Sequence, residues 1–511
     1  MTLIRTLGKV FAKPLYRYFV RPLKQSMKTQ EKTLSKIIRM NQDTQFGKEH
    51  KFRQITSIKQ FQENVPAHSY EHFRPYIDLM TKGGANVLVR GNPRYWGKTA
   101  GSTGAPKLIP ITAQSIKNAT NGVLRIYLSY LAENPQKHSQ FLDGTVCFFH
   151  ANPTLEYINK IPVGFGTGIF SQSTRNQLWS PFFQRSMYST AHLFKINDLD
   201  KRYRQLTREL TGKNITVFAG VTTFVLSLLE VILKYTQHAN PDVKYIKEIF
   251  PNCQLAILGG ECPKFYEDRL FSVIGRDLEY REVYGATEEI IAVQLQGEPG
   301  LTPLFDANFL EFCEENSEER LLFPEIKKHV NYKMIITNFN GLYAYILGDV
   351  VKFISVDPPR LIFSHREGTV NMASEKMTVQ QITDALILTN QEHHCAIAEY
   401  CVIGKYTPKP HYIFILEYLP GQTPADGKKY LNALNQNLMT INPVYRSQLE
   451  VVPAMMAPEL MIVKIGTFFT LEQQNLQEGV PMGQHKIQHL SLNANLLKKF
   501  ANYIEKEINL D

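Results

Sequence analysis

The sequence is poor in the residues that cross-link small secreted domains or build metal sites. Its 511 residues include only six cysteines, and none of them stands in a Cys-x-x-Cys pair. Neither a disulfide framework nor a zinc site is indicated by this spacing. The sequence also begins without the apolar run and cleavage site of a secretory signal peptide. We therefore expect a reducing, cytoplasmic compartment.

Long apolar runs are almost absent as well. Only residues 214–229 lack charge over a length that approaches a membrane span. Within them, Ile215–Gly220 is typical of a buried strand, and Thr222-Thr223 is typical of the cap of a helix that goes on to carry Glu230. The pattern predicts a strand, a turn and a helix rather than a membrane span.

The apolar content that is present indicates an ordered globular protein of more than one domain. Hydrophobic residues make up 43% of the chain and charged residues 20%. Short apolar runs alternate with helical stretches, at residues 144–149, 215–220, 254–258 and 279–283. This alternation predicts a parallel or mixed α/β sheet, whose ligands bind at the carboxyl ends of the strands.

Beyond residue 301 the pattern changes to short strands, which predicts a β-barrel-like subdomain over residues 301–356. A smaller α/β unit follows, with strands near 396–403 and 411–417 and a helix over 425–439. We therefore expect a large N-terminal α/β domain over residues 1–365 and a smaller C-terminal α/β domain over residues 366–511.

Basic residues crowd the first thirty positions, where they alternate with apolar side chains; these cations are Arg5, Lys9, Lys13, Arg17, Arg21, Lys24 and Lys28. An amphipathic helix interrupted near Pro14 is predicted over residues 1–30. Such a basic arm can bind a membrane surface or a partner. An ordinary helix lying on the main domain is the favoured interpretation, because a charged helix face is usually just solvated. We expect no nucleic-acid partner, and the oligomeric state stays open.

The most informative segment is the loop over residues 99–107, which gathers glycine, hydroxyl and lysine side chains between two apolar stretches. Glycine lets the backbone approach an anion, and hydroxyls and Lys107 bind phosphate oxygens. It is not a Walker A loop, because Lys107 leads into a short strand over 108–110 and a helix opens only after Thr112. The alternative is a simple polar turn.

Two further motifs carry nucleotide chemistry. In Tyr284–Glu288 the tyrosine ring can stack on adenine, glycine permits close approach, Thr287 can bind phosphate and Glu288 can hold Mg²⁺. In Tyr345–Asp349 an aspartate after a glycine turn can bind both ribose hydroxyls, although this residue also fits the start of a strand.

In this order and spacing the three motifs resemble the adenylate-forming superfamily, and more closely the auxin-responsive Gretchen Hagen three family of acyl acid amido synthetases. The resemblance extends to segments at 34–48, 65–70, 107–112, 309–312, 347–351, 442–445 and 466–468, and so covers most of the chain. It implies a mobile C-terminal domain, ATP with Mg²⁺, an acyl-adenylate intermediate and amide formation with an amino acid or other amine. The alternatives are an acyl-CoA ligase, which forms a thioester, and an inactive binding protein with this fold.

Two positions depart from the family pattern. The loop carries Ala100 where the family usually has a hydroxyl, and the third motif has Ala344 and Ile346 where the family often has polar side chains. Contacts from those positions to nucleotide or acid are therefore in doubt.

The predicted site comprises nucleotide-binding and catalytic residues. The resemblance implies an adenylation lysine on the C-terminal domain, which we expect to be Lys486, with Lys464 or Lys376 as alternatives. Cys262 is expected to be a core thiol rather than a nucleophile. Nucleotide contacts are expected from Gly101, Ser102, Thr103, Gly104, Lys107, Gly260, Tyr284, Gly285, Ala286, Thr287, Asp349 and Arg366, and catalytic roles from Lys486 and Glu288, of which Glu288 is also the Mg²⁺ ligand.

Overall fold

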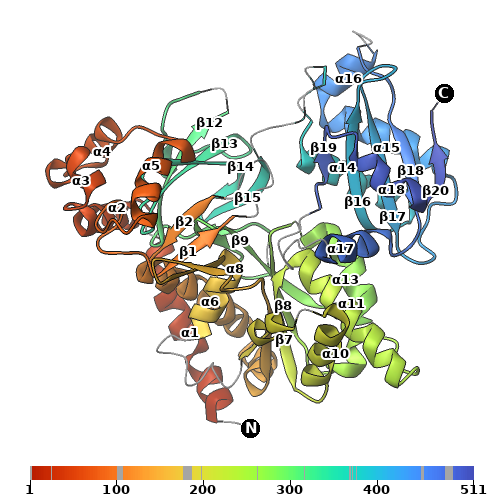
Figure 1. Cartoon of the computed structure of the whole chain (residues 1–511), viewed down its shortest axis with the longest axis horizontal. Helices are drawn as coiled ribbons and strands as arrows, with labels where there is room; N and C mark the ends of the chain where they lie inside the picture. Colours follow the sequence, from red (N-terminus) through yellow and green to blue (C-terminus); the bar gives the residue numbers. More distant parts are fainter. Residues whose placement is uncertain are drawn as a thin grey trace. The chain divides into compact units, whose positions relative to one another are not determined.

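The structure is a computed structural model, and it describes residues 3–24, 26–99, 107–175, 187–196, 198–261, 263–297, 299–315, 317–366, 370, 372–373, 375, 377–450, 454–477 and 487–510. The chain divides into two units (Figure 1). The first unit contains Met1–Pro263 and Val273–Phe363. The second unit contains Ser364–Asp511 together with a nine-residue segment from the middle of the chain, Lys264–Ser272.

The first unit begins with helices, namely α1 (Leu3–Lys24), α2 (Ser26–Asn41), α3 (Gln45–Glu49), α4 (Ile58–Asn64) and α5 (Tyr70–Thr81). Side chains cap two of them, since Thr44 accepts from the amide of Gly47 and Ser57 accepts from the amide of Gln60. The predicted interruption near Pro14 is wrong, because α1 continues through it. Pro14 has no N–H to donate to the carbonyl of Val10. Both residues are exposed, so water can bind that carbonyl instead.

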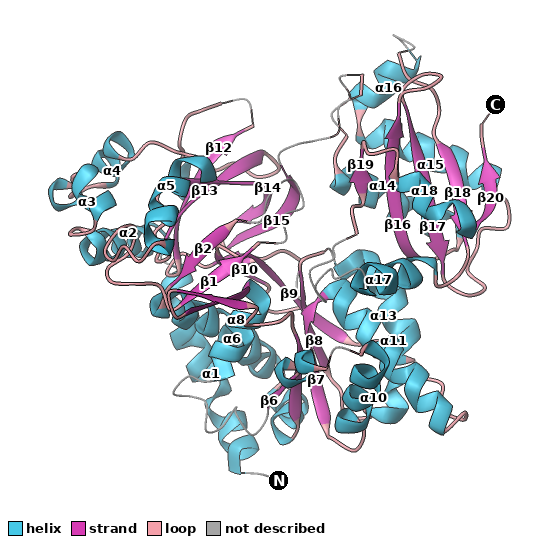
Figure 2. Ribbon diagram, in the orientation of Figure 1, coloured by secondary structure: helices cyan, strands magenta, loops and turns pink. Residues whose placement is uncertain are grey.

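A seven-stranded sheet in the order β11-β10-β9-β8-β7-β3-β6 forms the centre of the first unit (Figure 2). Strands β6, β3, β7, β8 and β9 pair in parallel, and β9, β10 and β11 pair antiparallel. The predicted mixed α/β sheet is therefore confirmed. The strands are β3 (Thr145–Phe149), β6 (Met187–Ser189), β7 (Ile215–Val221), β8 (Leu255–Gly259), β9 (Glu279–Ala286), β10 (Glu289–Val293) and β11 (Thr302–Pro303).

Helices connect and cover these strands: α6 (Ala113–Glu133), α7 (Pro135–His138), α8 (Gly166–Arg175), α10 (Leu199–Leu210), α11 (Thr222–Ala239) and α12 (Ile246–Ile249). Most of α13 (Glu267–Ile274) belongs to the Lys264–Ser272 segment of the second unit. The uncharged segment at 214–229 is strand β7 followed by α11, as predicted. Within the described ranges, no helix is both long enough and apolar enough to cross a membrane.

Two four-stranded sheets complete the first unit. One has the order β2-β1-β5-β4 and contains β1 (Tyr95–Lys98), β2 (Leu108–Ile111), β4 (Glu156–Ile158) and β5 (Ile161–Phe165). The other has the order β12-β13-β14-β15 and contains β12 (Asn308–Glu314), β13 (Asn331–Asn338), β14 (Tyr345–Val356) and β15 (Pro359–Arg366), whose last residues belong to the second unit.

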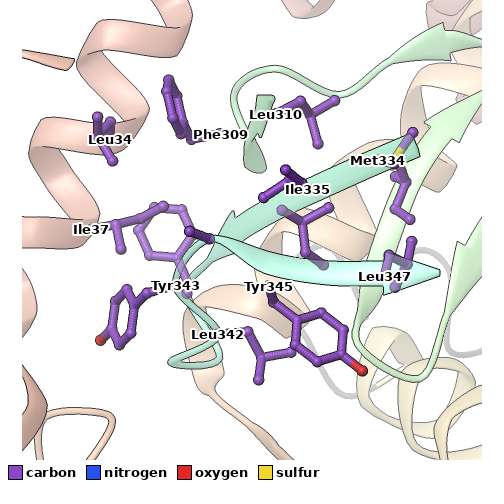
Figure 3. Close-up of a cluster of buried hydrophobic side chains, with 14 of the residues drawn as sticks. Leu34, Ile37, Phe309, Leu310, Met334, Ile335, Leu342, Tyr343, Tyr345 and Leu347 are labelled. Carbon is purple, nitrogen blue, oxygen red and sulfur yellow. The ribbon is translucent and has the colours of Figure 1, made fainter. Parts of the chain in front are cut away.

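A large apolar core of the first unit joins the N-terminal helices to this second sheet. Figure 3 shows Leu34 and Ile37 of α2 facing Phe309 of β12 and Ile335 of β13, with Leu347 of β14 in the same cluster. All of these side chains are buried. Their burial fixes β14, which carries the third motif, to the helical layer.

The second unit is built on a five-stranded sheet in the order β19-β16-β17-β18-β20. Its strands are β16 (Ile397–Lys405), β17 (His411–Tyr418), β18 (Glu459–Val463), β19 (Leu490–Ser491) and β20 (Ile504–Ile508). Its helices are α14 (Val379–His393), α15 (Gly427–Ile441), α16 (Pro443–Glu450), α17 (Thr467–Gln477) and α18 (Leu496–Phe500). The two strands and the helix predicted here are confirmed as β16, β17 and α15.

Candidate nucleotide site

The loop at 99–107 is a hairpin loop, because β1 and β2 pair antiparallel with Lys98 opposite Leu108. Two hydrogen bonds close its base. The amide of Thr99 donates to the carbonyl of Lys107 at 3.0 Å, and the amide of Lys107 donates to Thr99 Oγ1 at 2.9 Å. The predicted short strand after Lys107 is confirmed as β2, and α6 begins after Thr112, whose side chain caps it.

Lys107 lies at the exit of this loop, where Tyr70 positions it. The lysine Nζ is 5.1 Å from the centre of the Tyr70 ring. The Tyr70 hydroxyl donates to the carbonyl of Leu108 at 3.1 Å and accepts from the amide of Leu108 at 3.0 Å. Tyr70 therefore ties the start of α5 to the first residue of β2, and its ring lies next to the Lys107 ammonium group.

The carboxyl ends of β7, β8 and β9 meet at one edge of the parallel sheet. Val221 is paired with Gly259, and Gly259 with Val283. Gly260 therefore follows β8 next to the point where Tyr284 continues β9, and its φ of +89° requires glycine. Parallel α/β sheets bind their ligands at this edge.

Thr222 was predicted to cap α11, but it is the first residue of that helix. Val221 occupies the cap position, without a side-chain hydrogen bond. The Thr222 hydroxyl instead donates to the carbonyls of Gly259 and Glu261, each at 3.2 Å. This contact ties the start of α11 to the turn that contains Gly260.

The second motif forms the end of β9 and a tight turn into β10. Tyr284, Gly285 and Ala286 lie in β9, and Thr287 and Glu288 form the turn. Thr287 packs against β1, since a Cβ on Gly97 would lie 2.6 Å from its methyl group. Close packing through Gly97 thus brings the second motif against the strand that leads into the hairpin loop.

Glu288 is almost fully buried, and both its side-chain carboxylate and its backbone carbonyl accept hydrogen bonds. Its Oε1 accepts from the Tyr345 hydroxyl at 3.1 Å. Its carbonyl accepts from the side-chain amides of Asn338 at 3.1 Å and Asn340 at 2.9 Å. Asn340 Oδ1 in turn accepts from the amide of Thr112 at 2.8 Å. One network therefore links the turn, β14 and the strand after the hairpin loop.

Asp349 lies beside Tyr284. The Tyr284 hydroxyl donates to Asp349 Oδ2 at 2.7 Å, and both residues are buried. Strand β14 bulges here, since it advances from Ile346 to Val350 while β13 advances only from Ile335 to Lys333. Asp349 thus lies inside a strand rather than at a strand start.

The bulge includes Gly348, the residue before Asp349. Gly348 has a φ of +81°, and a Cβ added there would meet nothing within 4 Å. A ligand can therefore approach the backbone of this segment without displacing protein atoms.

Glu289, next to Glu288, has a different environment. It is fully buried, and burial raises the pKa of its carboxyl group to about 8. Hydrogen bonds from Ser115 and from the amide of Ile290 act in the opposite direction but are the smaller effects. At neutral pH this side chain carries a proton, so it belongs to the core.

Several predicted residues lie wholly or partly outside the described residues: Gly101, Ser102, Thr103, Gly104, Cys262, Lys376 and Lys486. Arg366 is the last residue of β15, and only its backbone is described. Within the first unit the structure brings together the Tyr284–Glu288 turn and Asp349, with Gly260 at the neighbouring strand end, and Lys107 lies on the hairpin that packs against Thr287 through Gly97.

Sequence reasoning missed the residues that support this arrangement. Asn338, Asn340, Tyr70 and Tyr345 bind the motif residues or the backbone next to them. The Asn-Phe-Asn-Gly turn at 338–341 was a usable signal, because such turns often use asparagine side chains to satisfy the backbone.

The fold is that of adenylate-forming enzymes. A solved structure described as AtGH3.15 acyl acid amido synthetase in complex with 2,4-DB aligns with a TM-score of 0.81 and 16% identity, over 99% of this chain and 98% of that one. A 2-hydroxyisobutyryl-CoA ligase aligns less well, with a TM-score of 0.57 and 11% identity over 95% of this chain and 90% of that one.

Family comparison goes further than the fold. Residues 16–255 match the GH3 family N-terminal domain, residues 301–366 the central domain and residues 380–495 the C-terminal domain. The chain belongs to the GH3 family, as the sequence motifs indicated, and it is a ligase of the acyl acid amido synthetase class.

Two named relatives match about nine tenths of the chain. A jasmonoyl–L-amino acid synthetase of Nicotiana attenuata is 20% identical, over 91% of each chain. An indole-3-acetic acid-amido synthetase of Arabidopsis thaliana is also 20% identical, over 89% of this chain and 90% of the relative. The chain is thus equally distant from two relatives named for different acids.

Proposed function

We propose that this protein uses ATP and Mg²⁺ to activate a carboxylic acid as its acyl-adenylate, releasing pyrophosphate, and then transfers the acyl group to an amino acid or other amine with release of AMP. The observation that carries this proposal is that, in a GH3 chain, Tyr284 binds Asp349, Tyr345 binds Glu288, and Thr287 packs on Gly97 of the hairpin that leads to Lys107. Lys107, the Tyr284–Glu288 turn and Asp349 had each been assigned a nucleotide role from sequence.

The residues take the following roles. The hairpin loop with Gly101, Ser102, Thr103 and Gly104 wraps the phosphates, and Lys107 supplies a positive charge for them. Tyr284 and Gly285, beside Gly260, line the adenine, while Asp349 binds the ribose. The Tyr284 hydroxyl fixes the orientation of the Asp349 carboxylate through its hydrogen bond to Oδ2. Ala286 and Thr287 bring backbone and hydroxyl groups close to the α-phosphate, and Arg366 reaches the phosphate or ribose.

Glu288 is the residue that would hold Mg²⁺. Among the described residues, no group of three or more His, Cys, Asp or Glu side chains could hold a metal ion. A single carboxylate still fits Mg²⁺, because that ion takes most of its ligands from phosphates and water. When bound, the ion neutralises charge on the phosphates during attack by the carboxylate. The Tyr345 hydroxyl and the two asparagines hold Glu288 in place for this task.

Lys486 is proposed to act only in the adenylation step, from the second unit. An electrostatic contact to the reacting phosphate speeds such a transfer, and removing it costs on the order of 10² in rate. Lys486→Ala should therefore lose pyrophosphate exchange and still join a supplied acyl-adenylate to the amine. Equal loss in both half-reactions would reject this role, and selective loss of exchange in Lys464→Ala instead would assign it to Lys464.

The proposal is tested by following each half-reaction separately. A panel of aromatic, fatty and cyclopentane-ring acids is screened for acid-dependent ATP–pyrophosphate exchange, which selects the acid. With that acid, AMP release is then compared with amino acids and with coenzyme A as acceptors. Amide formation and AMP release with an amino acid are expected. Release with coenzyme A alone would establish the acyl-CoA ligase instead, and absence of any exchange would favour a non-catalytic binding protein.

A further inference from the structure

One face of helix α1 packs firmly on the first unit. Ala12, Val20 and Leu23 are buried, and Gly8 lets the helix approach closely, since a Cβ there would lie 2.5 Å from a methyl group of Leu142. Arg5 pairs with Asp143 at 2.9 Å. Figure 1 shows α1, in red, running beside α6. These contacts determine which side of α1 faces outward.

The outward side of α1 carries large apolar residues rather than polar ones. Tyr18 is 74% exposed and Val10 is 64% exposed, and Leu7, Phe11 and Leu15 are exposed as well. At 100° per residue, these five lie within one continuous sector of the helix. We call this sector the α1 apolar stripe. Single exposed apolar residues are ordinary, but five on one helix face indicate a binding surface.

A row of cations borders the α1 apolar stripe. Lys13, Arg17, Arg21 and Lys24 recur every three or four residues and are all exposed. Within the part of the chain that the structure describes, none of the four has an acidic partner within ion-pair distance. Residues 1–30 contain seven Lys and Arg and no Asp or Glu. The surface is thus apolar at its centre and positive along its edge.

We propose that the α1 apolar stripe and its row of cations dock this enzyme on an anionic lipid bilayer. An amphipathic helix with this composition lies in the plane of the membrane interface, with its apolar side chains among the acyl chains and its cations at the lipid headgroups. Tyr18 suits this boundary because it has an apolar ring and a polar hydroxyl. A protein partner would not require every charge on the helix to be positive, whereas an anionic headgroup layer does.

The proposal goes beyond the amide-forming reaction and does not depend on it. Membrane attachment would place the enzyme where amphiphilic carboxylic acids accumulate, but none of the α1 residues belongs to the nucleotide site. Variants of α1 should therefore keep acid-dependent pyrophosphate exchange at the wild-type rate in solution. This separates failure of the docking proposal from failure of the proposed function.

The test is sedimentation of the full-length protein with vesicles. Wild type should bind vesicles that contain one third phosphatidylglycerol, should bind pure phosphatidylcholine vesicles far less, and should be released by high salt. Phe11→Ser with Tyr18→Ser should abolish binding. Arg17→Gln with Arg21→Gln should weaken it roughly thirtyfold. The matched control, Tyr157→Ser with Lys59→Gln, changes exposed residues elsewhere and should bind as wild type does.

Three results would overturn the proposal: no binding of the wild type to anionic vesicles, equal binding to both vesicle types, or binding that survives Phe11→Ser with Tyr18→Ser. Light scattering identifies the main competing occupant. A wild-type dimer that becomes monomeric in the Phe11→Ser, Tyr18→Ser variant and binds no vesicles would assign the stripe to a second copy of the chain. Unchanged melting temperatures show that the variants fold.

Discussion

Each unit of this protein buries a carboxylate at a β-bulge beside a tyrosine hydroxyl, but the surroundings of the two carboxylates differ. In the first unit, Asp349 accepts from Tyr284 and borders Gly348, where added atoms would meet nothing within 4 Å. Its bulge lies near the Tyr284–Glu288 turn. A ligand can therefore approach the backbone next to this carboxylate.

In the second unit, Glu399 of β16 is enclosed by its own chain. Its Oε1 accepts at 3.0 Å from the Tyr266 hydroxyl and from the amide of Tyr400, and His489 Nε2 lies at the same distance. Arg269 is 3.7 Å from its Oε2. Tyr266 and Arg269 come from Lys264–Ser272, so Glu399 helps bind this distant segment into the second unit.

The difference indicates that Asp349 binds a ligand, whereas Glu399 stabilises the fold. A carboxylate surrounded by a cation, an imidazole, a hydroxyl and an amide has its hydrogen-bonding capacity used within the protein, and its loss leaves buried partners unpaired. A carboxylate that a tyrosine hydroxyl orients next to a glycine with space around its backbone is placed where a ligand can approach. Glu399 should therefore govern stability, and Asp349 should govern activity.

The largest effect is expected from Glu399→Ala. Removing one partner of a buried ion pair costs about 3–5 kcal/mol, because the other charge stays buried. Denaturant unfolding should show this loss in the free energy of unfolding of the second unit. Glu399→Gln, which keeps most of the hydrogen bonds, is the milder control. A Glu399→Ala variant as stable as the wild type would show that Glu399 does not stabilise the second unit.

Asp349→Ala should lose far more activity than Glu399→Ala, with a smaller loss of stability that comes from the unpaired Tyr284 hydroxyl. If Asp349 binds the ribose as proposed, kcat/KM for ATP should fall on the order of 10²-fold or more. Tyr284→Phe, which removes only the orienting hydroxyl, should give a smaller loss. If Asp349→Ala fails to fold while Tyr284→Phe is fully active, Asp349 is a structural residue.

Glu289→Gln should change stability rather than activity, because Glu289 adjoins Glu288 in the sequence but is enclosed in the core. Its pKa is about 8 in the folded protein, above its ordinary value of 4.5, so the folded state holds a proton that the unfolded chain has lost. Stability should therefore fall as pH rises from about 4.5 to about 8. Glu289→Gln should remove part of this decline and add on the order of a few kcal/mol at pH 9.

The control for this experiment is Glu63→Gln, which changes an exposed carboxylate and should leave the pH profile of stability unaltered. ATP affinity of Glu289→Gln should equal that of the wild type. A variant whose stability profile between about pH 5 and about pH 9 matches that of the wild type would show that Glu289 is ionised in the folded protein.

Lys107→Ala gives the smallest of the four effects. Loss of a charge-assisted contact to phosphate should weaken ATP binding by about 1.5 to 3 kcal/mol, measured by calorimetric titration. Lys98→Ala is the matched control, since this lysine lies on the same hairpin and pairs with Glu156 on the surface at 3.4 Å. Equal losses in the two variants would indicate a general effect of positive charge.

Much of the first unit followed from sequence because its signals are local. Apolar runs followed by Gly260 and by the Tyr284 motif marked the carboxyl ends of adjacent strands, and parallel pairing then brought those ends together. Thr112 at a strand–helix junction was also recognisable, because its capping role depends on the next three residues.

The remainder depends on contacts between residues far apart in the chain. Arg269 and Glu399 are separated by 130 positions, and nothing near either residue indicates the other. The bulge at Asp349 arises from the register of β14 against β13, which local sequence does not determine. The outward direction of the α1 apolar stripe depends on Gly8 and Ala12 packing on the first unit.

The most direct test of the account is thermal unfolding with and without ATP and Mg²⁺, in the wild type, Asp349→Ala and Glu399→Gln. A ligand that binds only the folded protein raises its melting temperature. We expect ATP to raise the melting temperature of the wild type, to raise that of Glu399→Gln by the same amount from a lower starting value, and to leave that of Asp349→Ala unchanged. An ATP-dependent rise of wild-type size in Asp349→Ala would contradict this expectation, as would a wild type that ATP leaves unchanged.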